Sequence, residues 1–114
     1  MIAPTFAEDS RPEFIVTTGM PASTAALKAI KDVGADVHLA CFDLSPGVMD
    51  MIGNGDAAFT IDQQQRLQGY MPVIVMHLYN ANAGLLPGAN IPSGPGFVDK
   101  SNYKSVASQA GVNR

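Results

Sequence analysis

Residues 40–70 read "ACFDLSPGVMDMIGNGDAAFTIDQQQRLQGY" and carry the strongest structural signal in the chain. The apolar strand of residues 36–44 is followed at once by Ser45, a residue that favours the N-cap of a helix, and by Pro46, which favours the first helical position. The helix ends in the "GNG" triplet, and the next apolar run, residues 57–62, forms another strand. This strand–helix–strand unit with short connections predicts two parallel strands joined by a right-handed crossover.

The same alternation continues on both sides of this unit. Residues 13–19 read as an apolar strand and residues 21–34 as a helix closed by a glycine. Residues 65–82 read as a long helix, in which Pro72 implies a kink or a late start. The remaining predicted elements are a short strand at residues 97–100 and a weak amphipathic helix at residues 101–114.

The order of strands and helices predicts an α/β fold: a three-layer sandwich lobe with a mostly parallel sheet. The strands are almost continuously apolar, which is typical of strands covered on both faces. The 114 residues suit one domain, here expected to be a partial one, with an irregular lead-in at residues 1–12 and a Gly/Pro-rich loop at residues 84–96.

Composition excludes several classes of function. The net charge is −3 and basic residues form no cluster, so nucleic acid is excluded as a partner. The apolar stretch at residues 71–79 is too short to cross a bilayer. Cys41 is the only cysteine, so no internal disulfide can form, and its mid-strand position predicts a buried small side chain. The first 14 residues lack the basic and apolar regions of a signal peptide, so the chain as written is expected to stay in the cytoplasm.

Polar side chains follow three of the predicted strands, at the edge where open parallel sheets bind ligands. Carboxylates accept hydrogen bonds and amides both donate and accept them, so this edge suits a neutral sugar or polyol. It has one glycine and no cation in the first loop, and is therefore a poor phosphate site. The candidate ligand-binding residues are Thr18, Gly19, Met20, Asp43, Asp62 and Gln63.

Purely structural explanations of these residues remain open. Asp43 can serve as a loop or capping residue, Asp62 with Gln65 fits a capping box, and the three glutamines at 63–65 can be solvated. The sequence offers no histidine–cysteine–acid spacing typical of a metal site and no nucleophile with a matching base. We therefore predict no catalytic residues, no metal, no cofactor and no enzymatic activity.

Three segments resemble the C-terminal half of type I periplasmic sugar-binding proteins, the ribose-binding-protein-like solute receptors of ABC sugar importers. They are "FIVTTGMPASTAALKAIKD" at 14–32, residues 40–79, and "IPSGPGFVDKSN" at 91–102. The most specific part is the order "FD-x-x-P", then "T-I-x-Q" and a glycine six residues on, and the resemblance covers about residues 13–103.

The resemblance implies that Asp43 and Gln63 bind sugar hydroxyls, with Asp62 beside them. Family members often have Asn or Asp in the preceding loop, whereas Thr18, Gly19 and Met20 stand at that place here, which implies a different specificity. The resemblance also implies an ABC transporter permease as partner and a periplasmic location.

Family members have two lobes that close on the ligand around a hinge. This chain matches only the second lobe and lacks that lobe's opening strand and helix, so we expect a truncated lobe that binds sugar weakly or not at all alone. A sheet that lacks a strand exposes an apolar edge, which is expected to promote self-association.

Two other functions remain as alternatives. The effector-binding domain of a repressor-type transcription regulator shares this fold, but no helix-turn-helix precedes the segment. A small flavodoxin-like α/β enzyme is also possible by fold, but the sequence offers no phosphate loop. A sugar or a flavin co-purified with the protein would separate these functions.

Overall fold

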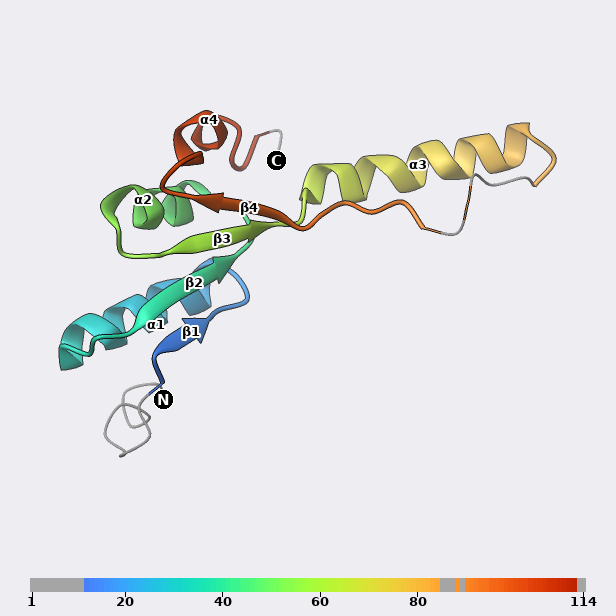
Figure 1. Cartoon of the computed structure of the whole chain (residues 1–114). Helices are drawn as coiled ribbons and strands as arrows, with labels where there is room; N and C mark the ends of the chain where they lie inside the picture. Colours follow the sequence, from blue (N-terminus) through green and yellow to red (C-terminus); the bar gives the residue numbers. More distant parts are fainter. Residues whose placement is uncertain (1–11, 85–87, 89, 113–114) are drawn as a thin grey trace.

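The computed structural model describes residues 12–84, 88 and 90–112, which form a four-stranded sheet in the order β1-β2-β3-β4 (Figure 1). The first three strands are parallel and β4 is antiparallel to β3. The α/β class and the mostly parallel sheet predicted from the sequence are therefore confirmed. The strands are β1 (Phe14–Val16), β2 (His38–Phe42), β3 (Phe59–Asp62) and β4 (Gly96–Asp99). The helices in the described residues are α1 (Met20–Val33), α2 (Pro46–Asn54), α3 (Gln65–Ala81) and α4 (Tyr103–Ala107).

Local signals place α1 and α2 where the sequence predicts them. Ser45 caps α2, because its hydroxyl oxygen accepts a hydrogen bond from the main-chain nitrogen of Val48 at 3.3 Å. Pro46 is the first helical residue. Gly34 and Gly55 end the two helices in the left-handed conformation, with φ of 61° and 84°.

The core lies between one face of the sheet and the helices α1, α2 and α4. Leu39, Cys41 and Val98 point from the strands into this layer, where they meet Val48 and Ile52 of α2. Cys41 is fully buried, as its mid-strand position predicts.

The opposite face of the sheet carries a row of aromatic side chains. The rings of Phe14, Phe59 and Phe97 follow one another across the sheet, with centroid distances of 6.0 Å and 5.5 Å. Phe14 and Phe97 are exposed. Within the described residues the sheet is thus covered on one face only, and the third layer expected from the apolar strands is not formed. The physical reason is the direction of α3, which leaves the sheet instead of folding back over it (Figure 1).

Helix α3 forms an arm that projects from the sheet, and the chain runs back beside it toward β4 (Figure 1). The helix starts at Gln65 and continues through Pro72, so of the kink or late start that the sequence predicts, the late start does not occur. Pro72 removes only the hydrogen bond that its nitrogen would have donated to the carbonyl of Gln68. None of the residues of α3 is buried, and the molecule measures 60 × 29 × 20 Å along its principal axes.

The sequence predicts an irregular lead-in at residues 1–12 and a Gly/Pro-rich loop at residues 84–96. The lead-in at residues 1–12 lies almost entirely outside the described residues. Residues 90–95 of the Gly/Pro-rich loop contain neither helix nor strand, and β4 begins at Gly96. Among the described residues, every helix is too short or too polar to traverse a lipid bilayer.

Candidate functional site

Asp43 and Gln63 meet at the carboxyl ends of two neighbouring strands. In the parallel register of β2 and β3, Phe42 pairs with Ile61, so the residues that follow leave the sheet at the same edge. The side-chain nitrogen of Gln63 donates a short hydrogen bond to Oδ1 of Asp43. Both residues are half-buried, so the carboxylate and the amide remain within reach of solvent. The structure therefore brings together the two residues on which the sequence-based prediction depends.

The backbone of Asp43 is held in an unusual conformation. Its φ is 78°, in the left-handed region that residues other than glycine rarely adopt. Its nitrogen donates to the carbonyl of Ile61 at 3.0 Å, and its carbonyl accepts from the hydroxyl of the buried Thr60 at 2.8 Å. These bonds to β3 fix the direction in which the carboxylate leaves the sheet. A strained residue that its surroundings hold in place is typical of functional sites.

The loop after β1 approaches the same pair. A Cβ atom placed on Gly19 would lie 3.8 Å from Oδ2 of Asp43, and Gly19 has φ of 120°. The loop is fixed by the hydroxyl of Ser23, which donates to the carbonyl of Gly19 at 3.0 Å. Thr18 is exposed beside it, whereas the Met20 side chain lies against Gly47 of α2 and packs on the core. Gly19 thus borders the pair, Thr18 is its exposed neighbour in the chain, and the contacts of Met20 are apolar packing.

Asp62 lies under the site and not on its surface. It is 0% exposed, and its Oδ1 accepts a hydrogen bond from the main-chain nitrogen of Gln64 at 2.7 Å. The carboxylate therefore holds the turn that leads from β3 into α3. The sequence suggests a capping box of Asp62 with Gln65, but the N-cap residue of α3 is Gln64 and not Asp62. The side-chain oxygen of Gln65 is buried without a hydrogen-bond partner among the described residues.

Sequence reasoning missed Gln68 and Ser93. The side-chain nitrogen of Gln68 donates to the carbonyl oxygen of Gln63 at 2.8 Å and lies 3.3 Å from the side-chain oxygen of Gln63. It also lies 3.2 Å from the hydroxyl of Ser93, in the segment that returns to β4. No signal in the sequence could have joined these residues, because the contact depends on how the return segment passes α3.

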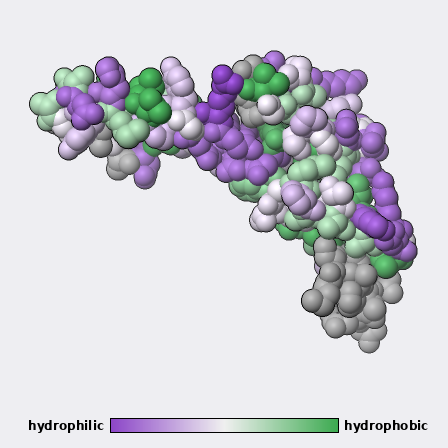
Figure 2. All heavy atoms as spheres, turned by 180° about the vertical axis from the view of Figure 1, so that it is seen from behind, coloured by the Kyte–Doolittle hydropathy of each residue, from purple (hydrophilic) through white to green (hydrophobic). Residues whose placement is uncertain are grey.

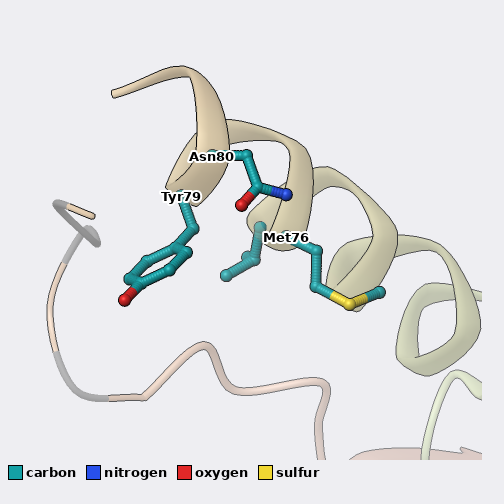
Figure 3. Close-up of a pocket in the computed structure, with 4 residues that line it drawn as sticks. Met76, Tyr79 and Asn80 are labelled. Carbon is teal, nitrogen blue, oxygen red and sulfur yellow. The ribbon is translucent and has the colours of Figure 1, made fainter. Parts of the chain in front are cut away.

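Open hollows lie along the described part of the arm, and the two described next do not include the Asp43–Gln63 pair. One of about 430 Å³ is lined by Val75, Met76, Tyr79 and Asn80, and Figure 3 shows Met76 and Tyr79 projecting from α3 on the side of the returning chain. The other, of about 360 Å³, is lined by Gln64, Arg66, Leu67 and Tyr70. Within the described residues no three His, Cys, Asp or Glu side chains gather closely enough to hold a metal ion.

Comparison with known proteins places this geometry in context. A carbohydrate transporter from Acidothermus cellulolyticus 11B, solved in complex with myo-inositol, matches 94% of this chain with 37% identity and a TM-score of 0.84. The xylose/arabinose-binding protein XylF of Sulfolobus acidocaldarius is 36% identical over 71 residues, which are 62% of this chain. A periplasmic ribose ABC transporter from Conexibacter woesei matches 96% of the chain with a TM-score of 0.77 and 20% identity, which supports the fold alone. No family profile matches the sequence.

These findings confirm the resemblance predicted from the sequence. The chain has the fold of the type I periplasmic binding proteins, and its neighbours are sugar-binding proteins of ABC transporters. It spans 38% of the Acidothermus protein and 18% of the Sulfolobus protein.

Proposed function

We propose that this chain is a carbohydrate-binding lobe of an ABC importer solute receptor, in which Asp43 and Gln63 bind the hydroxyls of a neutral sugar or polyol. The observation that carries the proposal is the contact between these two side chains at the carboxyl edge of the sheet. It places a carboxylate and a primary amide side by side on a half-buried surface.

The chemistry of this pair matches neighbouring hydroxyl groups. A carboxylate has about four lone-pair sites, and Gln63 occupies one of those on Oδ1 of Asp43, so the others remain for sugar hydroxyls that donate. The amide of Gln63 can both donate and accept, which suits a second hydroxyl on the same ring. Hydrogen bonds to a charged group contribute about 1.5–3 kcal/mol each. Asp43 is thus expected to supply most of the polar binding energy of this lobe.

The ligands of the relatives support this class of solute. The Acidothermus protein was solved with myo-inositol, and the Sulfolobus protein is a xylose/arabinose-binding protein. Each of these ligands is neutral and carries hydroxyls on adjacent carbons. Two adjacent hydroxyls of such a molecule can bond to one carboxylate and one amide. Because the ligand is neutral, the site needs no positively charged side chain, whereas a phosphate site would.

The projecting arm suggests how the rest of the site is built. Helix α3 has no buried residue, and its apolar side chains Tyr70, Val73 and Met76 are each about 60% exposed. The Acidothermus protein matches 94% of this chain, and the chain spans 38% of that protein. We therefore assign α3 to the interface with the first lobe, which supplies the opposite wall of the sugar site.

A one-sided site has a direct consequence for affinity. Binding to one lobe costs the ligand the same translational freedom as binding in a closed cleft, but the ligand gains contacts on one face only. The chain alone is expected to bind sugar weakly, and tight binding requires the first lobe. By the same assignment the receptor works on the periplasmic side with a transporter permease, and it catalyses no reaction.

Chemical-shift mapping by NMR tests the proposal on the chain itself, because it detects weak binding. Addition of myo-inositol, arabinose or ribose should shift the signals of Asp43, Gln63 and Gly19 with Kd values in the millimolar range. The Asp43→Ala variant should lose these shifts, while Asn80→Ala on the arm should retain them. Shifts that centre on the hollows of α3, or micromolar affinity of the isolated chain, would disprove this assignment.

A further inference from the structure

Gln68 joins three parts of the connection between the sheet and the arm. Its side-chain nitrogen contacts the carbonyl and the side-chain oxygen of Gln63, in the crossover from β3 to α3, and the hydroxyl of Ser93, in the returning segment. We infer that Gln68 is a positioning residue. It orients the amide of Gln63 toward Asp43 and links the connection from β3 to α3 with the segment that returns to β4. This inference rests on the proposed function, in which Gln63 contacts the sugar.

The orientation of the Gln63 amide follows from what its two ends contact. Gln68 offers a donor to the side-chain oxygen of Gln63, at 3.3 Å, and this leaves the nitrogen of Gln63 on the side of the Asp43 carboxylate. The opposite orientation would place the Gln63 oxygen against a carboxylate oxygen, and neither group could donate. Gln68 and Asp43 thus select the same orientation from opposite ends of one amide.

The arrangement also orders a side chain that would otherwise be mobile. A glutamine at the surface samples many rotamers, and fixing it on binding reduces affinity by the entropy that is lost. Gln68 sits on the first turn of α3, five residues after Gln63, so the helix presents its amide to the crossover that precedes it. Because Gln68 meets the main-chain carbonyl of Gln63 at 2.8 Å as well, it restrains both the backbone and the side chain of that residue.

The Gln68→Met variant tests this role, because methionine keeps the length and the helix propensity but removes the donor. The first readout is NMR relaxation of the side-chain amide of Gln63, which requires no ligand. We expect this amide to be ordered in the unchanged chain and clearly more mobile in Gln68→Met. Ser93→Ala removes one of the three contacts and should give an intermediate result. Asn80→Met, at the far end of the same helix, is the matched control and should leave the Gln63 amide unchanged.

The second readout is the affinity for myo-inositol measured by NMR titration. Loss of one ordering hydrogen bond should weaken binding about three- to tenfold in Gln68→Met. In a Gln63→Ala background the same substitution should have no further effect, which a merely structural role of Gln68 would not produce. An equally ordered Gln63 amide in Gln68→Met would overturn the inference, as would the same loss of affinity in both backgrounds. If no variant binds sugar, the proposed function fails, while the amide order still decides whether Gln68 positions Gln63.

Discussion

Asp43, to which we assign the central role in binding, has an unfavourable backbone conformation. A residue other than glycine pays about 1–2 kcal/mol in the left-handed region, and the carboxylate cannot be presented from this position without that cost. At position 43, sugar binding is therefore expected to favour aspartate, whereas folding stability is expected to favour glycine.

Substitution of Asp43 by glycine and by alanine separates these two demands. Both variants lose the carboxylate and should lose sugar binding. Asp43→Gly should nevertheless be more stable than Asp43→Ala by about 1 kcal/mol, because glycine tolerates positive φ. Urea unfolding of the two variants measures the difference, and equal stabilities would show that the backbone at this position is unstrained.

Asp99 provides a prediction on pH dependence. The hydroxyl of Ser101 donates a hydrogen bond to Oδ1 of Asp99, and the Ser101 main-chain nitrogen adds a second at 2.8 Å, which together hold the pKa of Asp99 below its ordinary value of 3.8. Since the pKa is lowered in the folded state, the associated stability is present above the ordinary pKa and is lost as the pH falls through the lower value. NMR titration of the Asp99 carboxyl should give a midpoint below 3.8, and Ser101→Ala should raise it. A midpoint that does not respond to Ser101→Ala would contradict this cause.

At the scale of the elements, the junction between β3, α3 and β4 depends on close approach of the backbone. A Cβ on Gly94 would lie 2.9 Å from the main-chain oxygen of Asp62, so the returning segment passes directly against the end of β3. This approach brings Ser93 to Gln68. The guanidinium of Arg66, in the first turn of α3, also donates a hydrogen bond to the main-chain carbonyl of Val112 at 2.5 Å.

Two alanine substitutions test the junction against a matched site on the arm. Gly94→Ala forces a side chain against backbone and should destabilise the chain by about 1–3 kcal/mol. Gly69→Ala meets open space inside α3 and should stabilise it by about 0.5–1 kcal/mol, because glycine weakens a helix interior. Thermal unfolding of both variants gives the signs, and a neutral Gly94→Ala would mean that the return segment does not pack as described.

Elements with strong local signals could be predicted from the sequence, and their placement in space could not. Ser45, Pro46 and the glycines at helix ends act within a few residues, so α1, α2 and the parallel strands followed from the sequence alone. The adjacency of Asp43 and Gln63 followed as well, because parallel strands end at one edge. The direction of α3 and the bonds of Gln68 depend on long-range packing that no local pattern encodes. The apolar strands predicted a sheet with helices on both faces, whereas in the described residues helices cover only one face.

At the scale of the whole molecule, the described residues leave apolar side chains exposed on the sheet and on the arm. The sheet exposes Val16 on its edge strand and Phe97 across the open face, with 59% and 58% of their surface accessible. The arm adds a second apolar surface, and Figure 2 shows hydrophobic side chains along it next to hydrophilic ones. Among the described residues β1 pairs with β2 on one side only, and such a strand edge can pair with another chain.

We therefore expect the isolated chain to form dimers or larger species through the edge at β1. Val16→Lys should shift the population toward monomer, because a charged edge residue opposes strand pairing. Val73→Lys on the arm is the control for association through α3. Light scattering coupled to size exclusion measures the species, and a monomeric unchanged chain would refute the expectation.

The direct test of the site is calorimetry on a chimaera in which this chain replaces the matching part of the Acidothermus protein, so that a first lobe closes over the ligand. We expect the chimaera to bind myo-inositol or a related sugar, and Asp43→Ala to weaken that binding by about 100-fold, which corresponds to roughly 2.7 kcal/mol. Lys28→Ala, on the exposed surface of α1, is the control and should leave the affinity unchanged. Equal affinity with and without the Asp43 carboxylate, or a chimaera that binds none of the sugars tested, would contradict the role assigned to the Asp43–Gln63 pair.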